Sequence, residues 1–319
     1  MENIIINIII CVIGLLGLFY GGEKLVAGSI STASIFKVNP QFIAITIIAF
    51  GTSFPELVVS INAVIDKSPG IAWGNVVGSN ISNILLVLGL ASLINPFSFK
   101  REAFTVNIFW LFTSTITFFL VSIGTKNISF YSGLTFIFIL VLILSHVTYI
   151  SKRNNQQKEI IGVEHNFSIS KSILFVFFGI FILIISAKVL VNSAVKISSI
   201  VGVPETFIGL TVIAIGTSLP EITASIIAVK KGHSGIAIGN VIGSNIFNTL
   251  GIVGTAAIFS TADKFFVPKS FLIFDIPIML ISTLLFCLLI YYSDKISRNI
   301  GVLFIISYFV YVFLNLKIT

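Results

Sequence analysis

The stretch GTSFPE at residues 51–56 recurs later in the chain as GTSLPE at residues 216–221. A second stretch, GNVVGSNISN at residues 74–83, recurs as GNVIGSNIFN at residues 239–248. Both recurrences have the same offset, since 216 − 51 and 239 − 74 both equal 165. Two motifs repeated at one spacing indicate an internal duplication, so the chain is expected to contain two structurally similar halves.

The composition around these motifs indicates a membrane protein. Of 319 residues, 56% are hydrophobic and only 10% are charged, and the mean hydropathy is +1.10. A chain with so little polar surface cannot coat a soluble globule. A helix needs about 20 mostly apolar residues to cross the hydrocarbon core. That rule predicts ten spans, at residues 4–36, 41–65, 71–95, 103–122, 129–150, 171–200, 205–229, 234–259, 274–292 and 297–316.

The first apolar run follows Met1-Glu2-Asn3 rather than a basic segment, so we expect it to be a retained helix and not a cleaved signal peptide. It is long for one span and is expected to be tilted or broken near Gly21 and Gly22. The +7 net charge does not indicate nucleic-acid binding, because no Lys/Arg stripe forms along one face. Cys11 and Cys287 lie in separate apolar runs and are expected to be packing residues.

The polar stretch Ser151–Ser170 divides the ten spans into five and five. We therefore predict a first repeat at residues 1–150, a connecting loop at 151–170 and a second repeat at 171–319. A duplicated unit with an odd number of spans inserts its second copy upside down, so the predicted fold is an all-α integral membrane protein of two inverted five-helix repeats.

Both copies of the first motif fall near the middle of a predicted span. An ionisable residue there costs about 2.5 to 3.5 kcal/mol on insertion scales, so Glu56 and Glu221 need a functional reason. Pro55 and Pro220 lack an amide hydrogen, so each helix is expected to break just before its glutamate. Such a break should free the backbone carbonyls near Ala49 and Ala214.

The side chains near each glutamate are all hard oxygen donors. Hydroxyls and amides come from both motifs of each half, at Thr52, Ser53, Ser79, Asn83, Thr217, Ser218, Ser244 and Asn248. No Cys or His occurs in these motifs, which disfavours zinc, copper and iron and favours Ca2+ or Na+. Two glutamates carry a charge of about −2, which one Ca2+ or two Na+ would neutralise. Because Ca2+ and Na+ would compete for the same two carboxylates, we expect the protein to exchange one cation for the other.

Other residues in the motifs have simpler interpretations. Small-xxx-small spacing predicts close helix packing at Gly17, Gly21, Gly74, Gly78, Gly239 and Gly243. Asn80 and Asn245 could form interhelical hydrogen bonds or line the ion path. Glu102 and Asp275 begin predicted spans, where a carboxylate opposes the helix dipole, and are expected to be structural.

Lys and Arg are more frequent in the loops after odd-numbered spans than in those after even-numbered spans. Because basic loops stay in the cytoplasm, both termini are expected outside the cell.

At the two repeated motifs the sequence resembles the Ca2+/cation antiporter superfamily, specifically the prokaryotic Na+/Ca2+ exchangers with two inverted α-repeats. The resemblance implies a prokaryotic inner-membrane antiporter that is not an enzyme, has no cofactor and transports Ca2+ and Na+ at four clustered sites. By position, Glu56 and Glu221 would bind Ca2+ with Thr52 and Thr217.

The same resemblance assigns further Na+ and central-site contacts. These would be Ala49, Ser53, Ser79, Ala214, Ser218 and Ser244 for Na+, and Asn83 and Asn248 for the central position. Some relatives carry Asp at one of those two central places, so K+ dependence stays open. The resemblance also implies that the first and sixth spans slide against the rest.

Three other interpretations remain open from sequence. A Ca2+/H+ antiporter uses a similar architecture but a different acidic motif. A cation channel or a Na+-coupled symporter could also use inverted halves with broken helices. An intramembrane enzyme is disfavoured, because no His-Glu-x-x-His or Gly-x-Ser-x-Gly element occurs. The sequence does not determine stoichiometry, affinity, oligomeric state or transport direction.

Overall fold

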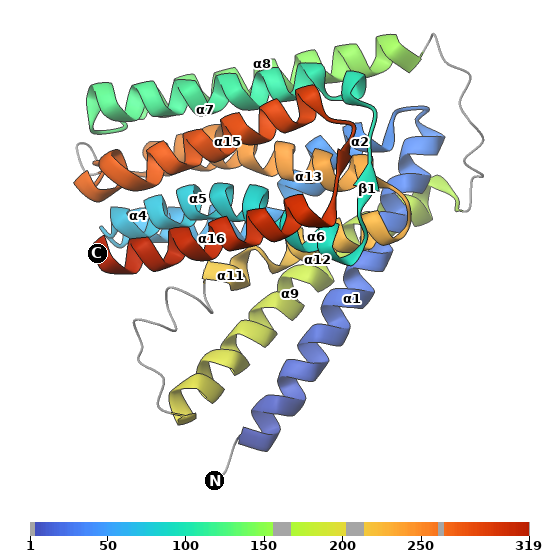
Figure 1. Cartoon of the computed structure of the whole chain (residues 1–319), viewed down its shortest axis with the longest axis horizontal. Helices are drawn as coiled ribbons and strands as arrows, with labels where there is room; N and C mark the ends of the chain where they lie inside the picture. The colour runs from blue at the N-terminus through green and yellow to red at the C-terminus, as the bar shows by residue number, and fades with distance from the viewer. Residues whose placement is uncertain (1–3, 156–166, 202–213, 261–264, 319) are drawn as a thin grey trace.

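The computed structural model describes residues 4–155, 167–201, 214–260 and 265–318, and these form an all-helical bundle (Figure 1). In the first half the chain runs through α1 (Ile4–Ile35), α2 (Pro40–Ile43), η1 (Ala44–Ile48), α3 (Ala49–Thr52), α4 (Phe54–Ile65), α5 (Pro69–Ser82), η2 (Asn83–Val87), α6 (Leu88–Ile94), β1 (Phe97–Ser98), η3 (Arg101–Ala103), α7 (Thr105–Thr125) and α8 (Phe130–Asn155). The second half contains α9 (Ile169–Val201), α11 (Ala214–Thr217), α12 (Leu219–Lys230), α13 (Ser234–Ile246), η5 (Phe247–Ile252), α14 (Val253–Phe259), η6 (Phe271–Asp275), α15 (Ile276–Tyr292), β2 (Lys295–Ile296) and α16 (Arg298–Ile318).

Eight of the described helices are long and apolar enough to cross a membrane, and a ninth span forms if the bent pair Pro40–Thr52 and Phe54–Ile65 counts as one. Their ends lie within a few residues of the predicted ones. The predicted span at 205–229 falls partly outside the described residues. The all-helical membrane fold is therefore confirmed, while the count of ten spans stays a prediction.

The helices that carry the second repeated motif lie at the centre of the bundle. In the most apolar window of Pro69–Ile94, 78% of residues are buried, and in that of Ser234–Phe259, 83%. The corresponding value for α1 is only 22%, and its exposed large apolar side chains lie between Ile5 and Tyr20, so the N-terminal half of α1 is peripheral. Helices α7 and α8 lie on one side of this centre, and α1 and α9 cross its opposite side at an angle (Figure 1).

Of the two alternatives expected for α1, a tilt or a break near Gly21 and Gly22, the break is not found, because the helix is continuous from Ile4 to Ile35. Both glycines are buried and serve close packing instead. A Cβ at Gly21 would lie 2.9 Å from the Cγ2 of Ile182 on α9, and one at Gly22 would lie 3.0 Å from the Cγ2 of Thr223 on α12. Small residues let the backbones of membrane helices approach closely, so α1 and α9 pack as one pair.

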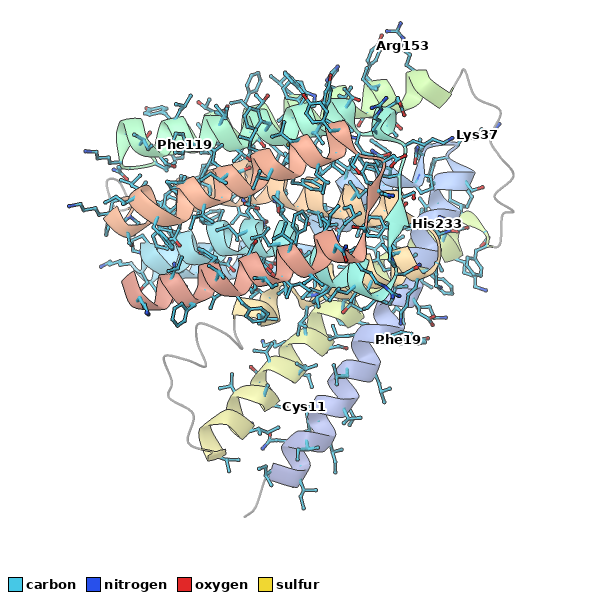
Figure 2. All side chains as sticks on the ribbon, viewed as in Figure 1. Cys11, Phe19, Lys37, Phe119, Arg153 and His233 are labelled. Carbon is cyan, nitrogen blue, oxygen red and sulfur yellow. The ribbon has the colours of Figure 1, made fainter. Side chains whose placement is uncertain are left out.

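Two short stretches of antiparallel backbone hydrogen bonding join the two halves, one at each end of the bundle. At one end Phe97 pairs with Ile296 in the antiparallel β1–β2 ladder. At the other end an isolated bridge pairs Asn127 with Phe266. Figure 2 shows that Lys37, Arg153 and His233 lie at the β1–β2 end. Lys37 and Arg153 follow the first and fifth predicted spans, whose loops are expected to be cytoplasmic.

Glycine at position 243 is required where α13 crosses η1. A Cβ there would lie 2.6 Å from the Cβ of Ala49 and closer still to the carbonyl oxygen of Ile45. By contrast, a Cβ at Gly78 would meet no atom within 4 Å among the described residues, so the packing role predicted for that glycine is not found.

Replacing Gly243 with alanine is expected to destabilise the protein by about 1–3 kcal/mol, because a rigid backbone oxygen blocks the added methyl group. Thermal unfolding of the purified protein in detergent measures the effect. The matched control is Gly124→Ala, whose Cβ would meet no described atom within 4 Å. Equal melting temperatures for the two variants would contradict the prediction.

Candidate cation site

The glutamate-bearing helices break at the same motif position in both halves. Helix α3 ends at Thr52 and α4 begins at Phe54, with a bend of 42° between the two segments. In the second half, α11 ends at Thr217 and α12 begins at Leu219. The intervening serines have nearly equal backbone angles, φ −84° and ψ 6° at Ser53 against φ −82° and ψ 1° at Ser218. The break expected from Pro55 and Pro220 is confirmed.

Of the carbonyls near Ala49 that the break was expected to free, that of Ala49 itself keeps a helical hydrogen bond. The oxygen of Ala49 accepts a hydrogen bond from the Ser53 amide at 3.0 Å and lies 3.5 Å from the Thr52 hydroxyl. Proline removes the donor only from its own position, so the carbonyl that loses its regular partner is that of Gly51. In the second half the Ser218 amide donates to Ile215 rather than to Ala214.

Glu56 and Glu221 are each only 1% exposed, and each lies in the first turn of its helix, α4 or α12. The N-terminal end of a helix stabilises a negative charge through the dipole and the unpaired amides of the first turn. The two glutamates lie in the same interior region, because Glu221 contacts Ser53, three residues before Glu56. The structure therefore gathers two buried acidic groups at the centre of the bundle.

Hydrogen bonds connect the motifs of the two halves directly. The hydroxyl of Ser53 in the first half donates to Oε1 of Glu221 in the second half at 3.2 Å. The hydroxyl of Thr52 donates to Oδ1 of Asn240 at 3.3 Å. Residues separated by 168 and 188 positions in sequence thus meet in one cluster.

Six predicted ligands present a buried oxygen that has no hydrogen-bond partner among the described residues. These atoms are Oε2 of Glu56, Oε2 of Glu221, Oγ of Ser218, Oγ of Ser244, Oδ1 of Asn83 and Oδ1 of Asn248. Buried polar atoms are nearly always paired, because leaving one unpaired costs about 1–3 kcal/mol. These unpaired carboxylate, hydroxyl and amide oxygens are the ligand types that hard cations take.

The remaining predicted ligands lie in the same segments. Ser79 is buried on α5, and Thr217 is partly buried at the end of α11, which begins at Ala214. The described residues contain no group of three or more His, Cys, Asp or Glu side chains placed to hold a metal ion. Any cation held here would therefore depend on hydroxyl and amide oxygens besides the two carboxylates.

Sequence reasoning did not assign a role to Asn75 or Asn240, although both recur at the offset of 165. The Nδ2 group of Asn75 donates to the backbone oxygen of Glu56 and to the hydroxyl of Ser60, each at 2.8 Å. That of Asn240 lies 3.4 Å from the hydroxyl of Ser225, which is 165 residues after Ser60. These bonds tie each glutamate helix to the next span of its own half.

Three of the cation-site segments lie next to wider, π-helical turns. Asn83 begins η2, Asn248 lies in η5, and η1 ends immediately before Ala49. A π-helical segment shifts the direction of the side chains that follow it and is frequent at functional sites.

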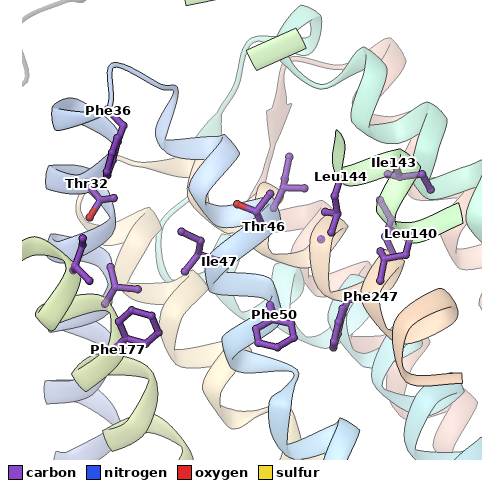
Figure 3. Close-up of a pocket in the computed structure, with 15 residues that line it drawn as sticks. Thr32, Phe36, Thr46, Ile47, Phe50, Leu140, Ile143, Leu144, Phe177 and Phe247 are labelled. Carbon is purple, nitrogen blue, oxygen red and sulfur yellow. The ribbon is translucent and has the colours of Figure 1, made fainter. Parts of the chain in front are cut away.

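A large apolar groove nearby is a separate feature (Figure 3). It has a volume of about 680 Å3 and lies between α1, α9, η1 and α8. Its lining includes Phe36, Phe50, Phe177 and Phe247 but no carboxylate. Apart from the hydroxyls of Thr32 and Thr46 the lining is apolar, and it has no carboxylate to balance a cation, so this groove is not the cation site.

Asp275 is buried but lies outside the cluster of cation ligands. Its Oδ1 accepts hydrogen bonds from the Tyr311 hydroxyl at 2.8 Å and from Nδ2 of Asn315. The side chain thus links η6 to α16, which is the structural role expected of it.

The sequence matches the family described as sodium/calcium exchanger protein over residues 6–149 and 171–317. This match covers most of the chain and includes every residue of the candidate site. The chain belongs to the sodium/calcium exchanger family.

Individual relatives and a solved structure are similar to most of the chain. The chain is 30% identical to the inner membrane protein YrbG of Escherichia coli, covering 92% of this chain and 91% of the relative. It is 30% identical to the sodium/calcium exchanger MaX1 of Methanosarcina acetivorans, covering 96% and 97%. Among solved structures it resembles the sodium-calcium exchanger NCX_Mj soaked with Na+ and Ca2+, with a TM-score of 0.82, 30% identity and coverage of 96% and 97%. The protein is therefore a multi-pass membrane protein of a cation-exchanger family.

Proposed function

We propose that this protein is a secondary active antiporter that exchanges Ca2+ for Na+ through a site centred on Glu56 and Glu221. The observation that carries the proposal is that six of the predicted ligands, from both halves of the chain and including both glutamates, each present a buried oxygen without a partner among the described residues. Burial of such atoms is costly unless a bound cation compensates them.

Each ligand class has a distinct role in this proposal. The two glutamates with the hydroxyls of Thr52 and Thr217 bind Ca2+, and Asn83 and Asn248 line the central position. Ala49, Ser53, Ser79, Ala214, Ser218 and Ser244 contribute oxygens to Na+ sites.

Charge balance makes this site suited to exchange. Two ionised glutamates carry −2, which one Ca2+ or at least two Na+ neutralise. Without a bound cation, the two ionised glutamates would be uncompensated charges in a low-dielectric interior. This cost hinders the protein from changing its accessible side while the site is empty. If more than two Na+ move for each Ca2+, the cycle carries net charge and responds to membrane potential.

Alternating access requires one part of the molecule to move past the other. The pair α1 and α9 lies on one side of the bundle and contacts the motifs themselves. A Cβ at Gly51 would collide with Ile180, and one at Gly216 with Val191, both on α9. We infer that α1 and α9 slide across these glycines, with residues 1–150 and 171–319 forming two inverted repeats around the site.

Na+ is favoured over H+ as the driving ion by the hydroxyls. A proton needs only the carboxylates, whereas the unpaired oxygens of Ser218 and Ser244 suit a dehydrated metal ion. The related exchanger NCX_Mj has been soaked with Na+, Ca2+ and Sr2+. A relative described as a sodium-calcium exchanger supports the proposal of a Na+-coupled cycle in this protein.

Ion-gradient measurements in proteoliposomes test the proposal. Vesicles loaded with Na+ and diluted into Na+-free medium with labelled Ca2+ should accumulate Ca2+, with pH clamped by buffer and protonophore. Uptake should vanish when Na+ is equal on both sides. Uptake that follows a pH gradient and ignores Na+ would assign the protein to Ca2+/H+ exchange, and Ca2+ flux without any counter-ion would indicate a channel.

Cysteine labelling tests the proposed orientation, with both termini outside. In a background with Cys11 and Cys287 replaced by alanine, Lys126→Cys should react with an impermeant thiol reagent on intact cells. Lys295→Cys should react only after the cells are opened, because Lys295 lies at the β1–β2 end. Both side chains are exposed, so the reverse pattern would invert the orientation.

A further inference from the structure

Four buried asparagines join the two halves beside the candidate cation site. Asn80 and Asn83 belong to the first half, and Asn245 and Asn248 occupy the positions 165 residues later. Each of the four is 1% exposed. Nδ2 of Asn83 donates to Oδ1 of Asn245 at 3.0 Å, and Nδ2 of Asn248 donates to Oδ1 of Asn80 at 3.2 Å. The two hydrogen bonds are therefore equivalent: in each, the later asparagine of one half donates to the earlier asparagine of the other half.

The orientation of these amides matters because a primary amide has two chemically opposite ends. Its oxygen accepts hydrogen bonds and binds cations, whereas its NH2 group donates hydrogens that repel a cation. A half-turn of the Asn83 side chain would exchange the two ends and place NH2 where a ligand oxygen is needed. A neighbouring group that accepts a hydrogen bond from the NH2 end of the amide prevents this rotation, because the amide oxygen could not donate in its place.

For Asn83 the orientation is anchored by a backbone carbonyl. Nδ2 of Asn245 donates to the backbone oxygen of Asn80 at 3.1 Å, and a carbonyl oxygen can only accept. The Oδ1 of Asn245 therefore points toward Asn83. Because this oxygen can only accept, Asn83 must donate its Nδ2 to it. The Oδ1 of Asn83 is left without a partner among the described residues, as the structure shows.

For Asn248 the anchor is weaker. Nδ2 of Asn80 lies 3.4 Å from Sδ of Met279, and a thioether sulfur is a weak acceptor. This contact turns Oδ1 of Asn80 toward Asn248, whose own Oδ1 is again unpartnered. The two central ligands are therefore held with unequal strength.

We propose that Asn80 and Asn245 are positioning residues that lock the amides of Asn248 and Asn83 with both carbonyl oxygens toward the cation. The proposal rests on the cation site described above and adds the groups that orient its central ligands. It resolves the role of Asn80 and Asn245 in favour of interhelical hydrogen bonds that serve the site.

Direct binding of labelled Ca2+ to the purified protein in detergent tests this role independently of transport. Asn245→Ala should weaken Ca2+ binding about tenfold or more, the usual effect of removing a group that orients a metal ligand. Met279→Leu, which removes only the weak anchor, should have a smaller effect. The matched control is Thr249→Val, whose hydroxyl donates to its own helix, and it should bind Ca2+ as the wild type does.

A double-mutant cycle separates positioning from general structural damage. If Asn245 acts through Asn83, adding Asn245→Ala to Asn83→Ala should weaken binding no further, whereas independent losses would multiply. Wild-type affinity in Asn245→Ala, or full additivity in the cycle, would overturn the inference while leaving the exchanger proposal intact. A wild-type protein that binds no Ca2+ would overturn both.

Discussion

Glu56→Gln and Glu221→Gln are each expected to abolish Na+-driven Ca2+ uptake in proteoliposomes. One remaining carboxylate cannot neutralise a divalent ion at a buried site, where an uncompensated charge is strongly unfavourable. The glutamine side chain keeps the shape and one oxygen of the glutamate, so the loss would report charge rather than packing. Near-normal Ca2+ uptake by either variant would remove these residues from the site.

Two other acidic residues serve as controls for this experiment. Glu102→Gln changes an exposed side chain beside Arg101 and should leave uptake close to that of the wild type. Asp275→Asn changes a buried carboxylate outside the cluster, which tests whether any buried acid is essential. Uptake in that variant should exceed that of both glutamate variants. Glu205, another acidic residue near a predicted span, lies outside the described residues.

Thr52→Val and Thr217→Val are expected to reduce Na+-driven Ca2+ uptake sharply, because each removes a ligand hydroxyl and keeps the branched shape. In Thr52→Val, Oδ1 of Asn240 also loses its donor. The initial rate of labelled Ca2+ uptake at a fixed Na+ gradient measures the effect.

The matched control for the threonine variants is Thr46→Val. Its hydroxyl donates to the backbone of its own helix at Phe42, so it contributes no ligand. Uptake in this variant should resemble that of the wild type. Equal rates in Thr46→Val and Thr52→Val would assign the motif threonines to helix packing and would weaken the argument for Na+ over H+.

The sequence alone predicted the membrane class and most helix ends, and it supplied the proposed residues of the candidate site. Hydrophobic run length sets helix spans in lipid, because every backbone polar group must be satisfied within the helix. The breaks at Ser53 and Ser218 were also predictable, since proline acts locally on the helix that contains it. The offset of 165 identified matched positions without any knowledge of contacts.

Only the tertiary structure decided what each matched residue contacts. Helix α1 is continuous through Gly21 and Gly22, where α9 and α12 pack against it, and a glycine pair in one segment indicates neither partner. The bonds from Ser53 to Glu221 and from Asn83 to Asn245 join residues more than 160 positions apart. Sequence spacing predicts which residues are neighbours along one helix. Whether an oxygen of this site has a hydrogen-bond partner depends instead on the donors that other helices place beside it.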